Sequence, residues 1–223
     1  MQLNSKSSGS DCCFFWIPKT AGSSIFASLH ASLEMQKRKR PKHFLSFPNK
    51  GAVTFGHVSY LDLRSLGVIS DEYHHRAYKF CIVRNPFTRA VSLFNYLKAI
   101  RRIDKDLEFE GFLDLVSDWC PPVGLYNSRG ISQANQQTNW IIGEHAEFLV
   151  DDIFHLEDLD RFKNVLEKRF NRVIDLSTRV NVSEKTLSLD DAYVAASTIE
   201  KVRIIYRRDF DLLGYRDDVI PMS

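Results

Sequence analysis

The strongest chemical signal in the sequence is a short turn of small and polar residues, Pro18-Lys19-Thr20-Ala21-Gly22-Ser23-Ser24. An apolar run precedes this turn and helical spacing follows it, so its backbone N–H groups should point outward at a helix N-terminus. Gly22 allows close approach of a ligand, Ser23 and Ser24 add hydroxyl donors, and Lys19 adds a mobile positive charge. The turn therefore suits a phosphate or a sulfate ester, although a plain strand–helix turn with an exposed lysine has the same composition.

The turn is not a Walker A loop. In G-x-x-x-x-G-K-[ST] the lysine follows the glycines at the start of the helix, whereas Lys19 precedes the only glycine of this turn.

A second constellation runs from Arg84 to Ser92, in the order Arg-Asn-Pro-Phe-Thr-Arg-Ala-Val-Ser. Arg84 follows an apolar run that should be a strand, and Ser92 lies about two turns along the helix expected next. A guanidinium and a hydroxyl in these places can close on one phosphate. Arg89 is more simply a helix-surface or packing arginine. Together the two constellations predict one ligand with two separated anionic groups.

The elements that position these residues follow from hydrophobic spacing. Short apolar runs predict buried strands over Cys12–Ile17, Tyr78–Val83 and Asp152–Leu156. Each run is followed by apolar residues at helical spacing, and Pro86 suits the first position of the second helix because it lacks an N–H. A last long helix is expected over Asp190–Tyr206. Strands that alternate with helices predict an α/β fold, a parallel sheet with helices on both faces.

Composition limits the function classes. The chain has 223 residues, 44% hydrophobic and 26% charged, with a net charge of +2. We expect a single domain over residues 1–223, with residues 1–10 disordered. The balanced charge argues against a protein whose whole surface grips nucleic acid, and no apolar stretch reaches the roughly 18–20 residues that span a bilayer. The four cysteines, including an adjacent pair, favour a reducing compartment over a zinc site or a disulfide framework.

The two constellations resemble the nucleotide-binding motifs of sulfotransferases that use 3′-phosphoadenosine 5′-phosphosulfate (PAPS). Lys19–Ser24 resembles their 5′-phosphosulfate loop, and the Arg84–Ser92 segment resembles their 3′-phosphate motif. The segment Phe55–Asp62 is similar to the region that holds the catalytic histidine in the glycosaminoglycan 2-O-sulfotransferases of that family. Weaker similarity runs through Gln137–Trp140, His155–Leu159 and Ile204–Tyr215, so the resemblance spans most of the chain.

This resemblance implies a three-layer, P-loop-NTPase-like fold and a role for each matching residue. Lys19 would contact the phosphosulfate bridge, Arg84 with Ser92 would hold the 3′-phosphate, and His57 would be the catalytic base. The loop Asn181–Thr186 resembles the loop that closes over the nucleotide. The remaining residues implied to bind the nucleotide are Thr20, Ala21, Gly22, Ser23, Ser24 and Lys185. The acceptor-binding loops of the family do not match, which leaves the acceptor open.

Several other side chains have two interpretations. His57 stands out among the seven histidines by its Gly-His context after an apolar strand, with His145 and His155 as reserve candidates. The basic run at 37–42 either attracts an acidic polysaccharide or is a solvated face. Glu157 is either a metal-binding carboxylate or a helix-start residue. Tryptophans 119 and 140 either stack on a sugar or pack in the core.

The sequence thus predicts an enzyme that transfers a sulfuryl group from PAPS to a hydroxyl, on a carbohydrate or another acceptor, by in-line displacement. The reaction yields 3′-phosphoadenosine 5′-phosphate (PAP) and needs no metal. We expect neither nucleic acid nor a membrane as a partner of the enzyme. A cytoplasmic location is expected, and a Golgi lumen location would require a native membrane anchor outside this sequence. The alternatives are an ATP-dependent P-loop-type phosphotransferase and a non-catalytic binder of a nucleotide or a sulfated glycan.

Overall fold

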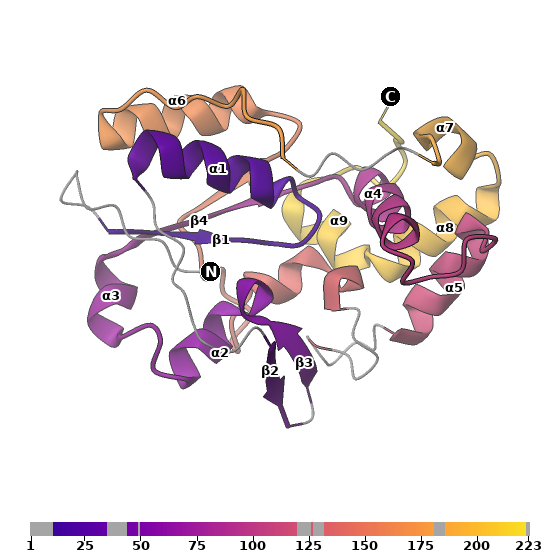
Figure 1. Ribbon diagram of the computed structural model, residues 1–223, viewed down its shortest axis with the longest axis horizontal. Coiled ribbons are helices and arrows are strands. Elements are labelled where there is room, and N and C mark those ends of the chain that lie inside the picture. Colours follow the sequence, from indigo (N-terminus) through magenta and orange to yellow (C-terminus); the bar gives the residue numbers. More distant parts are fainter. Residues whose placement is uncertain are drawn as a thin grey trace. The chain divides into compact units, whose positions relative to one another are not determined.

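The computed structural model describes residues 11–34, 44–48, 50–119, 126, 132–180 and 186–221 (Figure 1). By their contacts they form two compact units, and the chain passes between the units after residues 45, 52, 83, 138 and 181. Unit 1 contains the parallel sheet, whereas unit 2 is mainly helical. A single domain over residues 1–223 stays a prediction, and residues 1–10 and 37–42 lie outside the described residues.

The sheet of unit 1 has three parallel strands in the order β1-β4-β5. Their bounds are Cys12–Phe15 for β1, Tyr78–Val83 for β4 and Asp152–His155 for β5. In register, Phe14 of β1 lies beside Phe80 of β4, and Ile82 of β4 lies beside Phe154 of β5. Buried side chains on both faces of β1 and β4 explain why these strands read as continuous apolar runs.

One face of this sheet is covered by α1, Gly22–Leu33, and α6, Leu159–Phe170 (Figure 1). Aromatic side chains dominate the contact, since the rings of Phe14 and Phe80 stack at 5.5 Å and Phe162 of α6 lies 6.1 Å from Phe80. The fully or largely buried members of this core are Cys12, Phe14, Ile25, Leu29, Leu33, Tyr78, Phe80, Ile82, Phe154, Phe162, Leu166, Phe170 and Ile174.

The opposite face is covered by α2, Tyr60–Ser65, and α3, Asp71–Arg76 (Figure 1). Phe15 of β1 stacks on Tyr60 at 4.5 Å, and the hydroxyl of Tyr73 donates to the carbonyl of Cys12 at 2.6 Å. Burial raises the pKa of the Cys13 thiol to about 11, as expected for a strand with no solvent on either face. Helices, sheet and helices form the three-layer α/β architecture that the sequence predicts.

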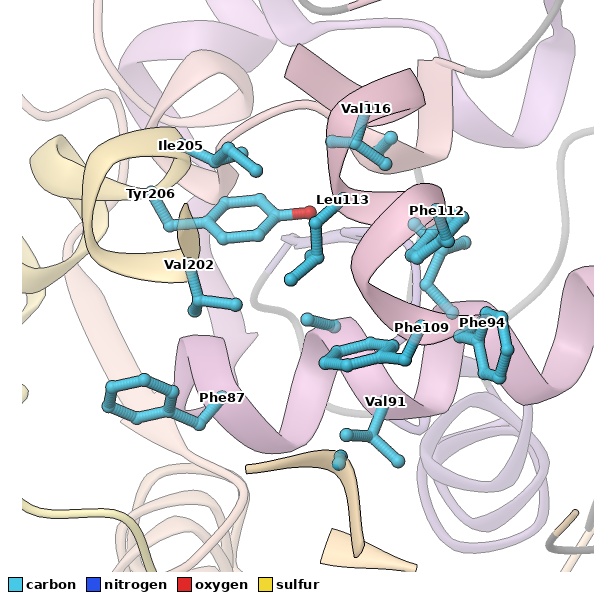
Figure 2. Close-up of a cluster of buried hydrophobic side chains, with 14 of the residues drawn as sticks. Phe87, Val91, Phe94, Phe109, Phe112, Leu113, Val116, Val202, Ile205 and Tyr206 are labelled. Carbon is cyan, nitrogen blue, oxygen red and sulfur yellow. The ribbon is translucent and has the colours of Figure 1, made fainter. Parts of the chain in front are cut away.

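Unit 2 is built around a second apolar core (Figure 2). Its helices are α4, Pro86–Ala99; α5, Phe109–Trp119; α7, Leu189–Ala192; α8, Ala196–Ile205; and α9, Arg207–Leu213. In Figure 2, Phe94 of α4 lies beside Phe109 and Phe112 of α5. Each such buried side chain contributes about 1.5–3 kcal/mol of transfer free energy.

The remaining elements are short. The strands β2, Phe44–Phe47, and β3, Gly51–Thr54, form a separate two-stranded sheet. Three 3₁₀ helices complete the described residues: η1, Phe55–His57; η2, Ser132–Ala134; and η3, Gln137–Trp140. None of the helices in the described part combines the length and hydropathy that crossing a lipid bilayer requires.

Three sequence-based expectations about elements are wrong, and the smallest difference is that the strand expected over Asp152–Leu156 ends at His155. The first strand ends at Phe15 rather than Ile17, because the N–H of Ile17 turns back to the carbonyl of Phe15 at 3.1 Å. The continuous helix expected over Asp190–Tyr206 is broken into α7 and α8. The hydroxyl of Thr198 donates to the carbonyls of Ala192 and Ala195, at 3.0 and 2.7 Å, and so stabilises the break.

Candidate functional site

The Lys19 turn, residues 18–24, joins β1 to α1 through two residues in the left-handed region. Lys19 has φ 67° and Ala21 has φ 58°. The first helical hydrogen bond runs from the N–H of Ile25 to the carbonyl of Ala21 at 3.1 Å. Ala21 is the N-cap residue and offers no side-chain acceptor to the first N–H groups of α1, whose first turn also has no acidic residue. This helix N-terminus therefore has the polarity that favours an anion.

Two side-chain hydroxyls of the turn, those of Thr20 and Ser24, are engaged inside unit 1. The hydroxyl of Thr20, fully buried, donates to the carbonyl of Ile17 at 3.0 Å. The hydroxyl of Ser24 donates to the carbonyl of Val180 at 3.2 Å and accepts from the N–H of Val180 at 2.9 Å. Lys19 and Ser23 are half-buried, and Ala21 is exposed. The hydroxyls of Thr20 and Ser24 thus hold the turn in shape.

Gly22 is also required by packing. A Cβ built at Gly22 would collide with the indole ring of Trp16, so a larger residue there must displace that ring. Trp16 is in turn stacked on Phe26 of α1, with 5.8 Å between ring centroids. The glycine that we assigned to ligand approach therefore also lets the indole pack against the helix start.

The same indole reaches His57. The 3₁₀ helix η1 directly follows β3, and His57 is its last residue. The side chain of His57 is half-buried. Its ring lies perpendicular to the Trp16 ring at 6.3 Å, and the indole N–H of Trp140 donates to its carbonyl at 3.1 Å. Trp16 thus brings the Lys19 turn and His57 together within unit 1. Sequence reasoning missed Trp16, whose only signal is a bulky aromatic residue just before the turn.

The second predicted anion site is the Arg84 turn, residues 84–86, which leads into α4 of unit 2. The side chain of Asn85 accepts from the N–H of Phe87 at 2.9 Å, and Pro86 occupies the first turn of the helix, as the sequence predicts. The Nε of Arg84 donates to the hydroxyl of Thr88 at 2.9 Å. Ser92 lies further along α4 and is half-buried. Thr88, which orients the guanidinium, was not singled out from the sequence.

Arg89 has the packing role that we favoured over ligand binding. It is buried, its guanidinium donates to the carbonyl of Gln133 at 2.8 Å, and it lies 5.6 Å from the centre of the Tyr206 ring. Trp140 is also buried, which favours its core role over stacking on a sugar.

The reserve candidates lie elsewhere in unit 1. His145 is exposed, His155 ends β5, and Glu157 is exposed just after that strand. Within the described ranges, no three or more histidine, cysteine or acidic side chains gather in a way that could hold a metal ion. Lys185 and residues 181–184 lie outside the described residues, so the nucleotide-closing role expected for that loop stays a prediction.

A family profile matches this chain. The profile of the sulfotransferase family covers residues 11–216, a range that includes the Lys19 turn, His57 and the Arg84 turn. No curated protein matches the chain. The family profile covers nearly the whole chain, and the three-layer α/β fold described above is consistent with the fold of that family. This protein therefore belongs to the sulfotransferase family, and its activity is sulfuryl transfer.

Proposed function

We propose that this protein transfers a sulfuryl group from PAPS to a hydroxyl of a carbohydrate acceptor. The acceptor oxygen attacks sulfur, and the bond between sulfur and the bridging oxygen of the 5′-phosphate breaks in line with the attack. The acceptor proton passes to the imidazole of His57, and PAP leaves with the electron pair of the broken bond. The atoms and charges balance without a further reactant.

The observation that carries the proposal is the double contact of Trp16. Its indole packs against Gly22 in the Lys19 turn and meets the ring of His57 at 6.3 Å. An anion-binding turn and a histidine with base chemistry are therefore held by one rigid side chain inside unit 1. Positioning of this kind is what transfer between two bound groups requires.

The Lys19 turn supplies the charge that the reaction needs. In the proposed complex, the N-terminus of α1 and the ammonium of Lys19 would bind the 5′-phosphosulfate and neutralise charge on the departing phosphate oxygen. The absence of acidic residues from the first turn of α1 supports this role.

The Arg84 turn is assigned to the 3′-phosphate. This assignment rests on the resemblance of the Arg84–Ser92 segment to the 3′-phosphate motif of the family and on the place of Arg84 directly after β4. The guanidinium of Arg84, oriented by Thr88, would meet the phosphate together with the hydroxyl of Ser92. A nucleotide with both anions would use both turns.

A carbohydrate acceptor is the most specific part of the proposal. It rests on the similarity of the Phe55–Asp62 segment to the glycosaminoglycan 2-O-sulfotransferases and on the place of His57 after β3. As general base, His57 must be neutral when the acceptor hydroxyl attacks, so its charge state controls turnover.

The direct test is transfer of radiolabelled sulfate from PAPS to a panel of acceptors: uronic-acid polymers, neutral sugars and small phenols. We expect labelling of a carbohydrate, and His57→Ala should lower turnover by about 10²–10⁴-fold while PAP affinity stays unchanged. His145→Ala is the matched control, because this exposed histidine of the same unit should leave turnover unchanged.

Three results would contradict the proposal. Wild-type turnover in His57→Ala would exclude this histidine as the base. Labelling of phenols alone would exclude a carbohydrate acceptor. Tight PAP binding without transfer to any acceptor would favour a non-catalytic binder.

A further inference from the structure

The backbone of Arg84 is held by the side chain of Gln137, 53 residues away in the chain. The Oε1 of Gln137 accepts from the N–H of Arg84 at 2.8 Å, and its Nε2 donates to the carbonyl of Arg84 at 2.8 Å. Only one orientation of the side-chain amide fits. If the amide were reversed, its NH₂ group would face the N–H of Arg84 and its oxygen would face the carbonyl of Arg84. Gln137 therefore binds Arg84 as a neighbouring strand would.

Gln137 is itself fixed by the carboxylate of Asp209 in α9. One carboxylate oxygen accepts from the N–H of Gln137 at 2.8 Å and from its Nε2 at 3.3 Å. The other accepts from the N–H and the hydroxyl of Thr138, at 3.0 and 3.1 Å. All three side chains are fully buried, so the arrangement excludes water. Both amide hydrogens of Gln137 have an acceptor, one on Arg84 and one on Asp209.

Burying a carboxylate is costly. Burial raises the pKa of Asp209, while the charge of Arg89 and the donors from Gln137 and Thr138 oppose that rise. A network of this kind rigidifies what it touches, because every partner is paired and little can rearrange. Through the side chain of Gln137, this network reaches the backbone of Arg84, which is a candidate ligand-binding residue.

We propose that Gln137, held by Asp209, is a positioning residue that fixes the backbone of Arg84 so that its guanidinium is preorganised for the 3′-phosphate of the nucleotide. Arg84 directly follows the last residue of β4, where strand pairing ends, and the Gln137 amide continues the pairing by one residue. The contact of Nε with Thr88 then sets the direction of the side chain. This inference rests on the proposed function, since it gives Gln137 a role only if Arg84 binds that phosphate.

The test compares two nucleotides that differ only in the 3′-phosphate, PAP and adenosine 5′-phosphate, by calorimetric titration. Gln137→Met keeps the length of the side chain and removes both hydrogen bonds to Arg84. We expect it to weaken PAP binding about tenfold, as loss of outer-shell partners does for metal ligands, and to leave adenosine 5′-phosphate binding unchanged. In an Arg84→Ala background the same substitution should cause no further loss.

Two further variants separate positioning from general loss of stability. Thr198→Val removes a buried hydroxyl of the same unit that does not contact Arg84, and it should leave PAP affinity unchanged. Thr138→Val removes one of the four hydrogen bonds to Asp209 and keeps side-chain volume, so it remains informative if Gln137→Met does not fold. We expect it to weaken PAP binding about two- to threefold.

The outcomes are distinct. Equal losses for both nucleotides, a loss that persists in the Arg84→Ala background, or wild-type PAP affinity in the Gln137 and Thr138 variants would each overturn the positioning role. A wild-type protein that binds both nucleotides equally would refute the 3′-phosphate assignment of the proposed function, and the role of Gln137 with it. A wild-type preference for PAP that Arg84→Ala removes, but Gln137→Met does not, would refute the positioning role alone.

Discussion

The Lys19 turn of unit 1 and the Arg84 turn of unit 2 both follow a parallel strand and lead into a helix, yet they offer an anion different groups. The Lys19 turn has no side-chain cap on α1, and the hydroxyls of Thr20 and Ser24 are engaged with protein carbonyls. In the Arg84 turn, the side chain of Asn85 caps α4. The first turn therefore presents backbone N–H groups, whereas the second presents a guanidinium.

The difference separates two ways to build an anion site. A site made of N–H groups depends on the path of the backbone, so it is sensitive to packing at Gly22 and to the hydroxyl of Thr20. A site made of one guanidinium depends on the charge and shape of that side chain and on what orients it. Substitutions should separate these two dependences.

The largest effect in this comparison is expected for Gly22→Ala. The added Cβ must displace the indole of Trp16, and the displacement should lower the free energy of unfolding by about 1–3 kcal/mol. Sulfuryl transfer should fall as well, because Trp16 also contacts His57. Chemical denaturation and turnover measure the two effects. Gly56→Ala is the matched control, since nothing lies within 4 Å of a Cβ there. Equal stability of the two variants would contradict the packing argument.

Arg84→Lys tests the second turn. Lysine keeps the positive charge but has neither the Nε–H that Thr88 accepts nor a second parallel donor, so PAP should bind about tenfold more weakly. Arg207→Lys, at an exposed arginine of α9 paired with Asp211, should bind PAP like the wild type. Titration calorimetry gives both affinities, and an undiminished affinity for Arg84→Lys would show that charge alone suffices.

A smaller effect is expected for Thr20→Val, which replaces a buried hydroxyl by a methyl group of similar volume. Loss of the hydrogen bond to the carbonyl of Ile17 should lower the free energy of unfolding by about 1 kcal/mol. If Thr20→Val unfolds like the wild type in denaturant, the hydroxyl does not hold the turn.

Local pattern predicts the frame of the molecule well. The strand Tyr78–Val83 has the predicted bounds, Pro86 lies at the helix start, and His57 follows a strand, because each of these depends on neighbours in the sequence. A strand that is buried on both faces also needs a continuous apolar run, and such runs are visible in the sequence.

What the sequence could not predict depends on distant contacts. The hydrogen bond from the Gln137 N–H to Asp209 joins residues 72 apart, and the packing of Trp16 against Gly22 depends on the path of the turn. The break before α8 escaped prediction for a related reason. The apolar stripe continues through it, whereas the hydroxyl of Thr198 satisfies carbonyls at the break.

In the proposed complex, the main chain of the Lys19 turn binds the 5′-phosphate of the nucleotide and the guanidinium of Arg84 binds its 3′-phosphate. A crystal structure of the protein with PAP would show both contacts. We expect the 5′-phosphate to lie against the N–H groups of Gly22 and Ser23, and the 3′-phosphate to lie within hydrogen-bond distance of Arg84 and Ser92. A 3′-phosphate bound away from Arg84, or a 5′-phosphate bound by side chains outside residues 18–24, would contradict it.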